Sequence, residues 1–217
     1  MARVSALVLL SGGLDSATCL YWAKKKFSEV RAITFNYYGR VEREMRAADA
    51  LAKSAGVSDV IEIALPFVKE MSDNPGGKKR RKSGDLWASY VPARNMMFYS
   101  IAAHHAEFLG INRIVAGHNS HDVGFFRDAS SSYINKLNSL FRLGCLLCNG
   151  KSYRIILPLA KMKREEIIKL AISLKTPIEL TWSCHRDGEN PCGNCYACRQ
   201  RGAAFRRLCI SDPGLTR

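Results

Sequence analysis

Residues 11–16, which read Ser-Gly-Gly-Leu-Asp-Ser, combine residue types that suit an anion-binding loop. The two glycines let the backbone approach a phosphate closely, and the start of a following helix would add N–H donors. Ser11 and Ser16 supply hydroxyl groups. Asp15 would repel a bare phosphate, so we expect a metal ion between the two. The pattern favours a nucleotide-binding loop over a plain strand-to-helix turn with an Asp or Ser cap.

Four cysteines near the end of the chain have the spacing of a metal site. Cys184, Cys192, Cys195 and Cys198 form the pattern C-x7-C-x2-C-x2-C. Thiolates suit zinc, and a spacing of two residues lets neighbouring sulfurs converge on one ion. We expect one Zn²⁺ here. An iron–sulfur cluster is the rival group, and His185 is an alternative ligand to Cys184.

The cysteine content points to a reducing compartment. The chain has eight cysteines and no visible secretory signal, which favours metal ligands or free thiols over disulfides. Cys145 and Cys148 form another C-x2-C, but in an apolar setting where cysteine commonly packs as a small hydrophobic residue. No window approaches the roughly 20 apolar residues of a membrane span. We therefore expect a cytoplasmic protein without membrane contact.

The chain is strongly basic. Lys and Arg number 33 against 19 Asp and Glu, which gives a net charge of +14. Such a surplus attracts tRNA, ATP and small anionic substrates alike, so the charge alone does not choose among them. Residues 72–84 carry a dense share of it in a polar, glycine-containing stretch. We expect a mobile, solvated loop there rather than a lid over phosphates.

Apolar runs that alternate with helical patterns predict the elements that position these groups. A buried strand over 4–10 ends at the glycine loop, and a helix follows over 15–26. This rhythm continues along the chain and predicts an α/β fold with a doubly wound, Rossmann-like parallel sheet. The further expected strands are 30–37, 57–65, 113–117 and 154–157, and the further expected helices are 41–55, 93–109 and 163–175. We expect residues 1–178 to form this domain and residues 179–217 a C-terminal zinc-binding and helical segment.

The glycine loop resembles the PP-loop signature of the adenine nucleotide α-hydrolase superfamily. That resemblance implies cleavage of ATP between the α and β phosphates, with Mg²⁺, to give an adenylate and pyrophosphate. It implies that the loop and the first turns of the following helix bind ATP. The implied ATP-binding residues are Leu10, Ser11, Gly12, Gly13, Leu14, Asp15, Ser16, Ala17, Thr18, Cys19 and Leu20.

Two short motifs mark the tail of the chain: residues 179–184 read E-L-T-W-S-C and residues 191–198 read P-C-G-N-C-Y-A-C. With these motifs the tail resembles the 7-cyano-7-deazaguanine synthase family. Residues 91–95, V-P-A-R-N, and the G-H-N of 117–119 also match segments of that family. The sequence departs from the family pattern at 40–42, at 127–130 and at the start of the helix near 163.

The resemblance implies that 7-carboxy-7-deazaguanine and ammonia are converted to 7-cyano-7-deazaguanine, a step toward queuosine- or archaeosine-type tRNA modification. Asp15 and Ser16 would act at the metal and the phosphates, and Lys163 or Arg164 at the α-phosphate. The substrate would meet Arg94, Asn95, Asp122 and Asp128, with Arg127 or Arg40 facing its carboxylate.

Two other functions stay open on the sequence. The first is an amidotransferase-like or other tRNA-modifying enzyme that also adenylates its substrate. The second is a zinc-knuckle RNA-binding protein, which would need aromatic residues interleaved with the basic ones, and the cysteine cluster offers only Tyr196. We expect small-molecule partners, leave a homodimer open, and expect no direct binding of tRNA.

Overall fold

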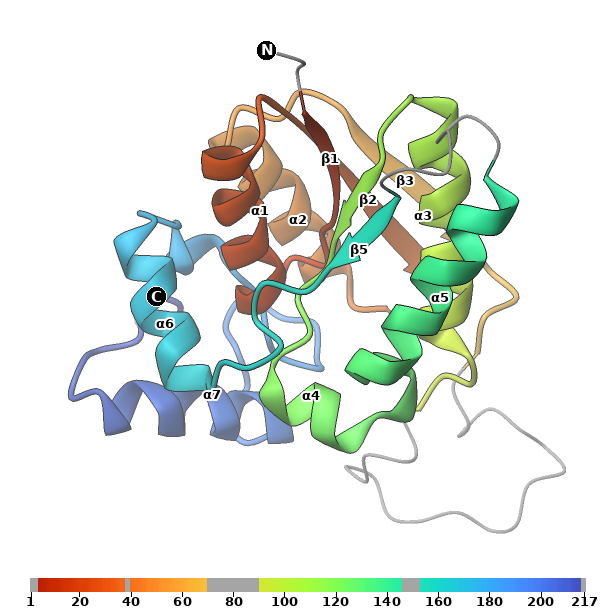
Figure 1. The fold of residues 1–217 in the computed structure, drawn as a ribbon. Coiled ribbons are helices and arrows are strands. Elements are labelled where there is room, and N and C mark those ends of the chain that lie inside the picture. The colour runs from red at the N-terminus through yellow and green to blue at the C-terminus, as the bar shows by residue number, and fades with distance from the viewer. Residues whose placement is uncertain (1–3, 38–39, 70–89, 146–152, 216–217) are drawn as a thin grey trace, which may run out of the picture.

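The computed structural model describes residues 4–37, 40–69, 90–145 and 153–215. Its centre is a parallel sheet of five strands in the order β3-β2-β1-β4-β5. The expected α/β fold is confirmed (Figure 1). The strands are β1 (Ser5–Leu9), β2 (Glu29–Tyr37), β3 (Val60–Leu65), β4 (Arg113–Val115) and β5 (Arg154–Ile156).

Helices cover both faces of the sheet (Figure 1). Because side chains alternate along a strand, β1 sends Leu7 to one face and Ala6 and Val8 to the other. Leu7 joins a core with α3 (Arg94–Phe108) and α5 (Ser131–Gly144). Ala6 and Val8 join a core with three other helices. These are α1 (Leu14–Lys26), α2 (Glu42–Ser54) and α6 (Arg164–Ser173).

The third strand begins later than the sequence indicated, at Val60 instead of residue 57. The reason is the end of α2. Gly56 adopts a φ of +64°, and Val57 donates its N–H to Ala52 O, which closes the helix in a Schellman-type turn. Val57 is therefore buried as part of the helix cap, and the strand starts after it. The basic stretch 72–84 and Cys148 lie outside the described residues.

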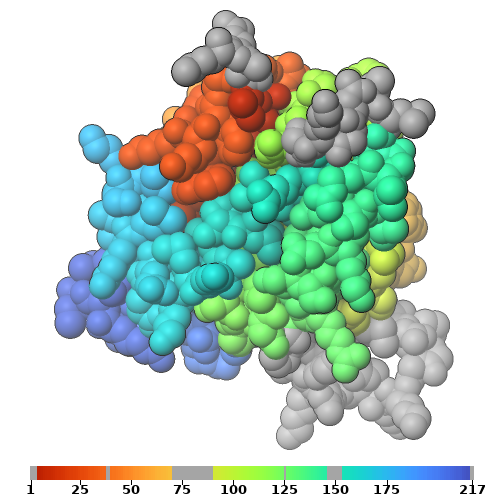
Figure 2. All heavy atoms as spheres, in the orientation of Figure 1, coloured from red at the N-terminus to blue at the C-terminus, as the bar shows by residue number. Residues whose placement is uncertain are grey.

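The C-terminal segment packs onto the sheet domain. η3 (Ile178–Leu180) and α7 (Tyr196–Arg207) follow α6, and α7 lies against α6 in the blue region of Figures 1 and 2. Ile178, Ala204 and Phe205 share a buried cluster with Leu14 and Ile168. The segment is thus joined to the start of α1 by apolar contact. The division at 178/179 into two domains stays a prediction.

Two short elements follow β4, namely α4 (Ser120–Phe125) and η2 (Arg127–Ala129). They bring the end of β4 toward α5. Among the described helices, none has the length and apolar character that crossing a membrane requires.

Candidate active site

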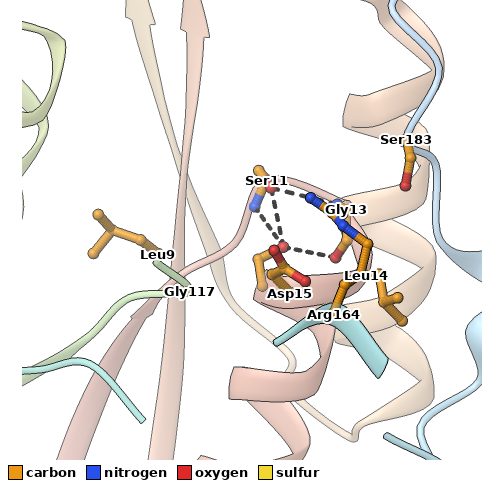
Figure 3. A pocket seen from close by; sticks show the side chains of 9 residues that line it. Leu9, Ser11, Gly13, Leu14, Asp15, Gly117, Arg164 and Ser183 are labelled. Carbon is orange, nitrogen blue, oxygen red and sulfur yellow. Dashed lines mark hydrogen bonds between the residues drawn. The ribbon is translucent and has the colours of Figure 1, made fainter. Parts of the chain in front are cut away.

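The strand order places a switch point between β1 and β4. The chain winds from β1 outward to β2 and β3 on one side, and β4 and β5 extend the sheet on the other. In open parallel sheets, ligands bind at such a point beyond the carboxyl ends of the strands. A cavity of about 260 Å³ opens there (Figure 3). Its lining consists of Leu9, Ser11, Gly13, Leu14, Asp15, Ser16, Gly117, Arg164 and Ser183.

Hydrogen bonds between residues of the loop itself hold its shape. Ser11 N and Ser11 Oγ lie 3.2 Å and 3.0 Å from Ser16 Oγ, and Gly13 N donates to Ser11 Oγ at 3.3 Å. Gly12 has a φ of +94°, and a Cβ there would overlap the carbonyl oxygen of Glu44 in α2. Only glycine therefore fits at this position without displacing α2.

Part of the expected ATP-binding run lies in the core instead of the cavity. Leu10, Ala17, Cys19 and Leu20 are buried, and Thr18 donates its hydroxyl to Leu14 O within α1. These residues anchor the helix beneath the loop. From the expected run, residues 11 and 13–16 line the cavity, together with Leu9, which the prediction did not include.

Asp15 has the features of a metal ligand. Its Oδ2 accepts a hydrogen bond from Asn119 Nδ2 at 2.8 Å, while its Oδ1 is buried without a partner among the described residues. Burial raises the pKa of this carboxyl group, against the opposing influence of Arg164, Asn119 and Arg201. A buried carboxylate oxygen without a donor favours a cation, and Mg²⁺ prefers such oxygen ligands.

Asn119 and Gly117 are site residues to which sequence reasoning gave no role. Asn119 accepts hydrogen bonds from His121 N and Asp122 N, which fixes its side chain as the cap of α4. Its amide group then meets Asp15. A Cβ on Gly117 would come within 3.0 Å of Ser16 N, so the close approach of the two loops depends on glycine. The sequence signal that could have identified these two residues is their position directly after β4, the strand that lies next to β1.

Of the two cations expected at the α-phosphate, the structure brings Arg164 to the loop. Arg164 lines the cavity, and its charge lowers the pKa of Asp15. Lys163 precedes it as the N-cap of α6, where its backbone N–H donates to Glu166 Oε2 at 2.7 Å. Lys163 is not among the described residues that line the cavity.

Three of the four expected substrate residues, Arg94, Asp122 and Asp128, influence the charge state of His118, which lies between Gly117 and Asn119 in the loop after β4. The pKa of His118 is lowered by burial and by Arg94, and Asp122 and Asp128 oppose that shift. The first residue of α3 and two acids from α4 and η2 are thus close enough to act on one imidazole. The fourth expected residue, Asn95, is buried beside Arg94 in α3.

The side chain of Arg40 is buried and binds other residues of the protein. Its Nη2 donates to Ser11 O at 2.8 Å, its Nη1 to Thr34 Oγ1 at 2.9 Å, and its Nε lies 3.6 Å from Glu44 Oε2. The side chain is 2% exposed. Burial raises the pKa of Glu44 to about 7, with the Arg40 charge opposing the shift. Arg40 therefore supports the loop, whereas Arg127 is exposed.

The four cysteines of the tail come together as the spacing predicted. All four sulfurs lie within 4.8 Å of one another. Cys184 Sγ accepts from the N–H groups of Arg186 and Cys192 at 3.4 Å each. Backbone N–H groups of Asn194 and Cys195 lower the pKa of Cys192 to about 6, so its thiolate is available at neutral pH. This group can hold a metal ion.

Cys145 behaves as the apolar setting indicated. It is partly buried and packs against the core that α3 and α5 share with the sheet. Its expected companion, Cys148, is not among the described residues, so the structure does not test the pair.

Comparison with known proteins decides the family. The family model described as "Queuosine biosynthesis protein QueC" matches residues 5–209. The chain belongs to the QueC family. A protein of Trichodesmium erythraeum named 7-cyano-7-deazaguanine synthase is 38% identical over 220 residues, which cover 97% of this chain and 99% of that protein. One from Thermoplasma volcanium with the same name is 36% identical and covers 96% and 89%.

Solved structures support the fold of this QueC-family chain. The U34-tRNA thiolase NcsA of Methanococcus maripaludis, solved with its [4Fe-4S] cluster, gives a TM-score of 0.52 at 16% identity, with 95% of this chain and 66% of that one covered. A 4-thiouridine synthetase in complex with RNA and ATP gives 0.50 at 21% identity, with 94% and 49% covered. At these identities the likeness shows a shared fold and no more.

Proposed function

We propose that this QueC-family enzyme converts 7-carboxy-7-deazaguanine and ammonia to 7-cyano-7-deazaguanine, with ATP as the activating substrate. The observation that carries the proposal is Asp15 in the glycine loop. One of its oxygens is held by Asn119, and the other is buried with no donor in the part of the chain that the structure describes. Asp15 lines the cavity at the switch point of the sheet together with Arg164. The family membership names the reaction that this site would serve.

The chemistry requires activation because ammonia does not displace oxide from a carboxylate. A substrate carboxylate oxygen attacks the α-phosphorus of ATP, the bond to the β-phosphate oxygen breaks, and pyrophosphate leaves. Ammonia then adds to the acyl carbon and AMP departs, which gives the amide and releases a proton. A second ATP activates the amide oxygen in the same way. Loss of AMP and of the two N–H protons yields the nitrile.

Different residues of the site would serve different steps of this reaction. The N–H groups and hydroxyls of the loop, from Ser11 to Ser16, hold the pyrophosphate. Asp15 Oδ1 would hold Mg²⁺, and the ion would supply charge stabilisation as pyrophosphate leaves. Arg164 neutralises charge that develops at the α-phosphate, and because it lines the cavity we favour it over Lys163.

Recognition of the deazaguanine is assigned to the residues around His118. An ionised carboxylate only accepts hydrogen bonds, so Asp122 or Asp128 suits the N1–H and exocyclic amine of the base. Arg127 is the exposed cation of the same segment, and we favour it over Arg40 for the substrate carboxylate. Asp128→Asn should weaken binding of 7-carboxy-7-deazaguanine and spare ATP binding. Unchanged affinity for the acid would remove Asp128 from the site.

We propose that the cysteine group holds a structural zinc ion. Four sulfurs at about 2.3 Å from one zinc lie about 3.8 Å apart, and Cys195 Sγ lies 4.0 Å from Cys184 Sγ. An iron–sulfur cluster would have to separate its ligands around several metal and sulfide atoms. Four thiolates leave no open position for a catalytic water, so the ion's role would be in folding. Metal analysis of purified protein that finds iron instead of zinc would contradict this assignment.

We also place the enzyme in the cytoplasm, since free cysteines at a metal group suit a reducing compartment. Its partners are small molecules, and a homodimer stays a prediction. The departures at 40–42 and 127–130 are the reason for one alternative, an amidotransferase-like or other tRNA-modifying enzyme that adenylates a different substrate. That alternative keeps the ATP site and changes the acceptor.

The products of ATP test the proposal. Turnover with 7-carboxy-7-deazaguanine and ammonium should release AMP and pyrophosphate and should need magnesium. ADP and phosphate as products would overturn the assignment of the loop. AMP formation with another acceptor, but none with this acid, would favour the alternative.

A further inference from the structure

Arg201 of α7 is a buried arginine whose three nitrogens are all engaged. Its Nε donates to Asp212 Oδ2 at 2.6 Å and its Nη2 to Asp212 Oδ1 at 2.8 Å, a bidentate pair in which each side chain is 4% exposed. Planar pairing of this kind fixes the orientation of the guanidinium. The remaining nitrogen, Nη1, is therefore directed at a defined place.

That place is the segment between η3 and the cysteine group. Nη1 donates to Thr181 Oγ1 at 2.8 Å and to Ser183 Oγ at 3.2 Å. Arginine has donors and no acceptor, so the Ser183 oxygen must accept in this bond. The hydroxyl hydrogen of Ser183 is then available for another partner, since it has no acceptor in the part of the chain that the structure describes.

Ser183 lines the same cavity as the loop serines. It borders the space enclosed with Ser11, Gly13 and Ser16, and Figure 3 shows it on the other side of Gly13 from Ser11. The segment is also fastened to the loop itself, because Trp182 donates its N–H to Gly12 O at 2.9 Å. The hydroxyl of Ser183 therefore has a fixed position relative to the loop backbone.

We propose that Ser183 is a further phosphate-binding residue of the ATP site, which donates its hydroxyl to the β- or γ-phosphate, and that Arg201 is the positioning residue that orients it. The inference rests on the proposed cleavage of ATP at this loop. Asp212, near the end of the chain, fixes Arg201 in turn. The cavity thus receives one donor from the C-terminal segment in addition to those of the loop.

The direct test is calorimetric binding of inorganic pyrophosphate, with magnesium, to Ser183→Ala. Loss of one hydrogen bond to a charged group should weaken pyrophosphate about 10- to 100-fold. Binding of AMP, which lacks both phosphates, should stay unchanged. Ser183→Thr keeps the hydroxyl and should retain binding within a few-fold. Ser173→Ala, an exposed serine of α6 whose hydroxyl donates to Leu170 O, is the matched control. Metal content, measured on each variant, should stay at the wild-type value.

Arg201→Lys tests the positioning role. Lysine keeps the positive charge but lacks the planar guanidinium that donates to Asp212 and Ser183 together. The substitution should therefore weaken pyrophosphate binding in the wild-type background and weaken it much less in the Ser183→Ala background. Equal weakening in both backgrounds would show that Arg201 acts on the fold and not through Ser183. Wild-type affinity for pyrophosphate in Ser183→Ala would overturn the inference while leaving the proposed function intact. A wild-type protein that binds neither ATP nor pyrophosphate would instead overturn the proposed function.

Discussion

Replacement of Asp15 by asparagine should make the ligand-free protein more stable while it destroys activity. The structure buries Asp15 Oδ1 without a partner among the described residues. An unsatisfied buried polar group costs about 1–3 kcal/mol, and more when it is charged. Asparagine keeps an acceptor for Asn119 Nδ2 and carries no charge. Since burial outweighs the favourable influence of Arg164, Asn119 and Arg201, removal of the charge is a net gain.

The dependence on pH has a definite sign. Because the folded-state pKa of Asp15 is raised above its ordinary value of 3.8, the native protein holds this proton more tightly than the unfolded chain does. The wild type therefore loses stability as pH rises through that folded-state pKa. We expect Asp15→Asn to melt about 2–4 °C above the wild type at pH 8, the shift that about 1 kcal/mol gives in a chain of this size. The difference in melting temperature between the two proteins should become smaller as the pH falls toward 4.

Bound ligand should reverse the order of stability, so that the wild type becomes more stable than Asp15→Asn. Pyrophosphate with magnesium at 100 times its dissociation constant should stabilise the wild type by about 2.7 kcal/mol and leave Asp15→Asn unmoved. The assay is thermal unfolding at pH 5 and pH 8, with and without both ligands, alongside turnover. Asp59→Asn, at an exposed aspartate between α2 and β3, is the control. A ligand-free variant less stable than the wild type at pH 8, or one that retains magnesium-dependent turnover, would refute the reasoning.

Three further perturbations follow from the same geometry. Gly12→Ala should abolish ATP binding and should destabilise the protein by more than the roughly 1–2 kcal/mol that a positive φ alone costs, since the methyl group also overlaps Glu44 O. Gly56→Ala, at a φ of +64° with open space around it, measures the conformational cost alone in thermal unfolding. Equal losses of stability in the two variants would contradict the clash with Glu44 O. The wild type should lose at most about 3 kcal/mol of stability as the pH rises from about 4.5 to 7, because the pKa of Glu44 is raised to about 7 in the folded protein. Glu44→Gln should remove this loss. Parallel profiles of stability against pH for the wild type and the variant would contradict the prediction. Cys192→Ser should lower bound metal and melting temperature before it changes the chemistry, as metal analysis and unfolding curves can show; full metal content with unchanged melting would exclude Cys192 as a ligand.

The sequence predicted the fold because its signals are local. Each predicted strand is a short apolar run and each predicted helix a run with helical spacing, so these element types followed from neighbouring residues. The helices α4 and α5 lie outside the predicted elements. The boundary error at Val57 arose because a strand-like apolar residue served to close a helix at Gly56. The glycine loop and the four cysteines were visible for the same reason, since each occupies one short stretch of chain.

The rest of the site depends on contacts that no local pattern records. Asn119 meets Asp15 across 104 positions of sequence, and Arg201 reaches Ser183 from the helix after the cysteine group. Arg40 was considered for the substrate carboxylate because it is a cation at a position where the family differs. Only the structure shows its guanidinium bound to Ser11 O beneath the loop. Side-chain engagement of this kind depends on tertiary packing.

The most direct test of the central claim is the mass of the product. Purified protein with magnesium, ATP, ammonium and 7-carboxy-7-deazaguanine should form 7-cyano-7-deazaguanine, with two AMP released for each nitrile. Asp15→Asn, run in parallel, should form none. Binding of ATP by the wild type without conversion of this acid to the amide or the nitrile would contradict the account and would point to another substrate for the same adenylating site.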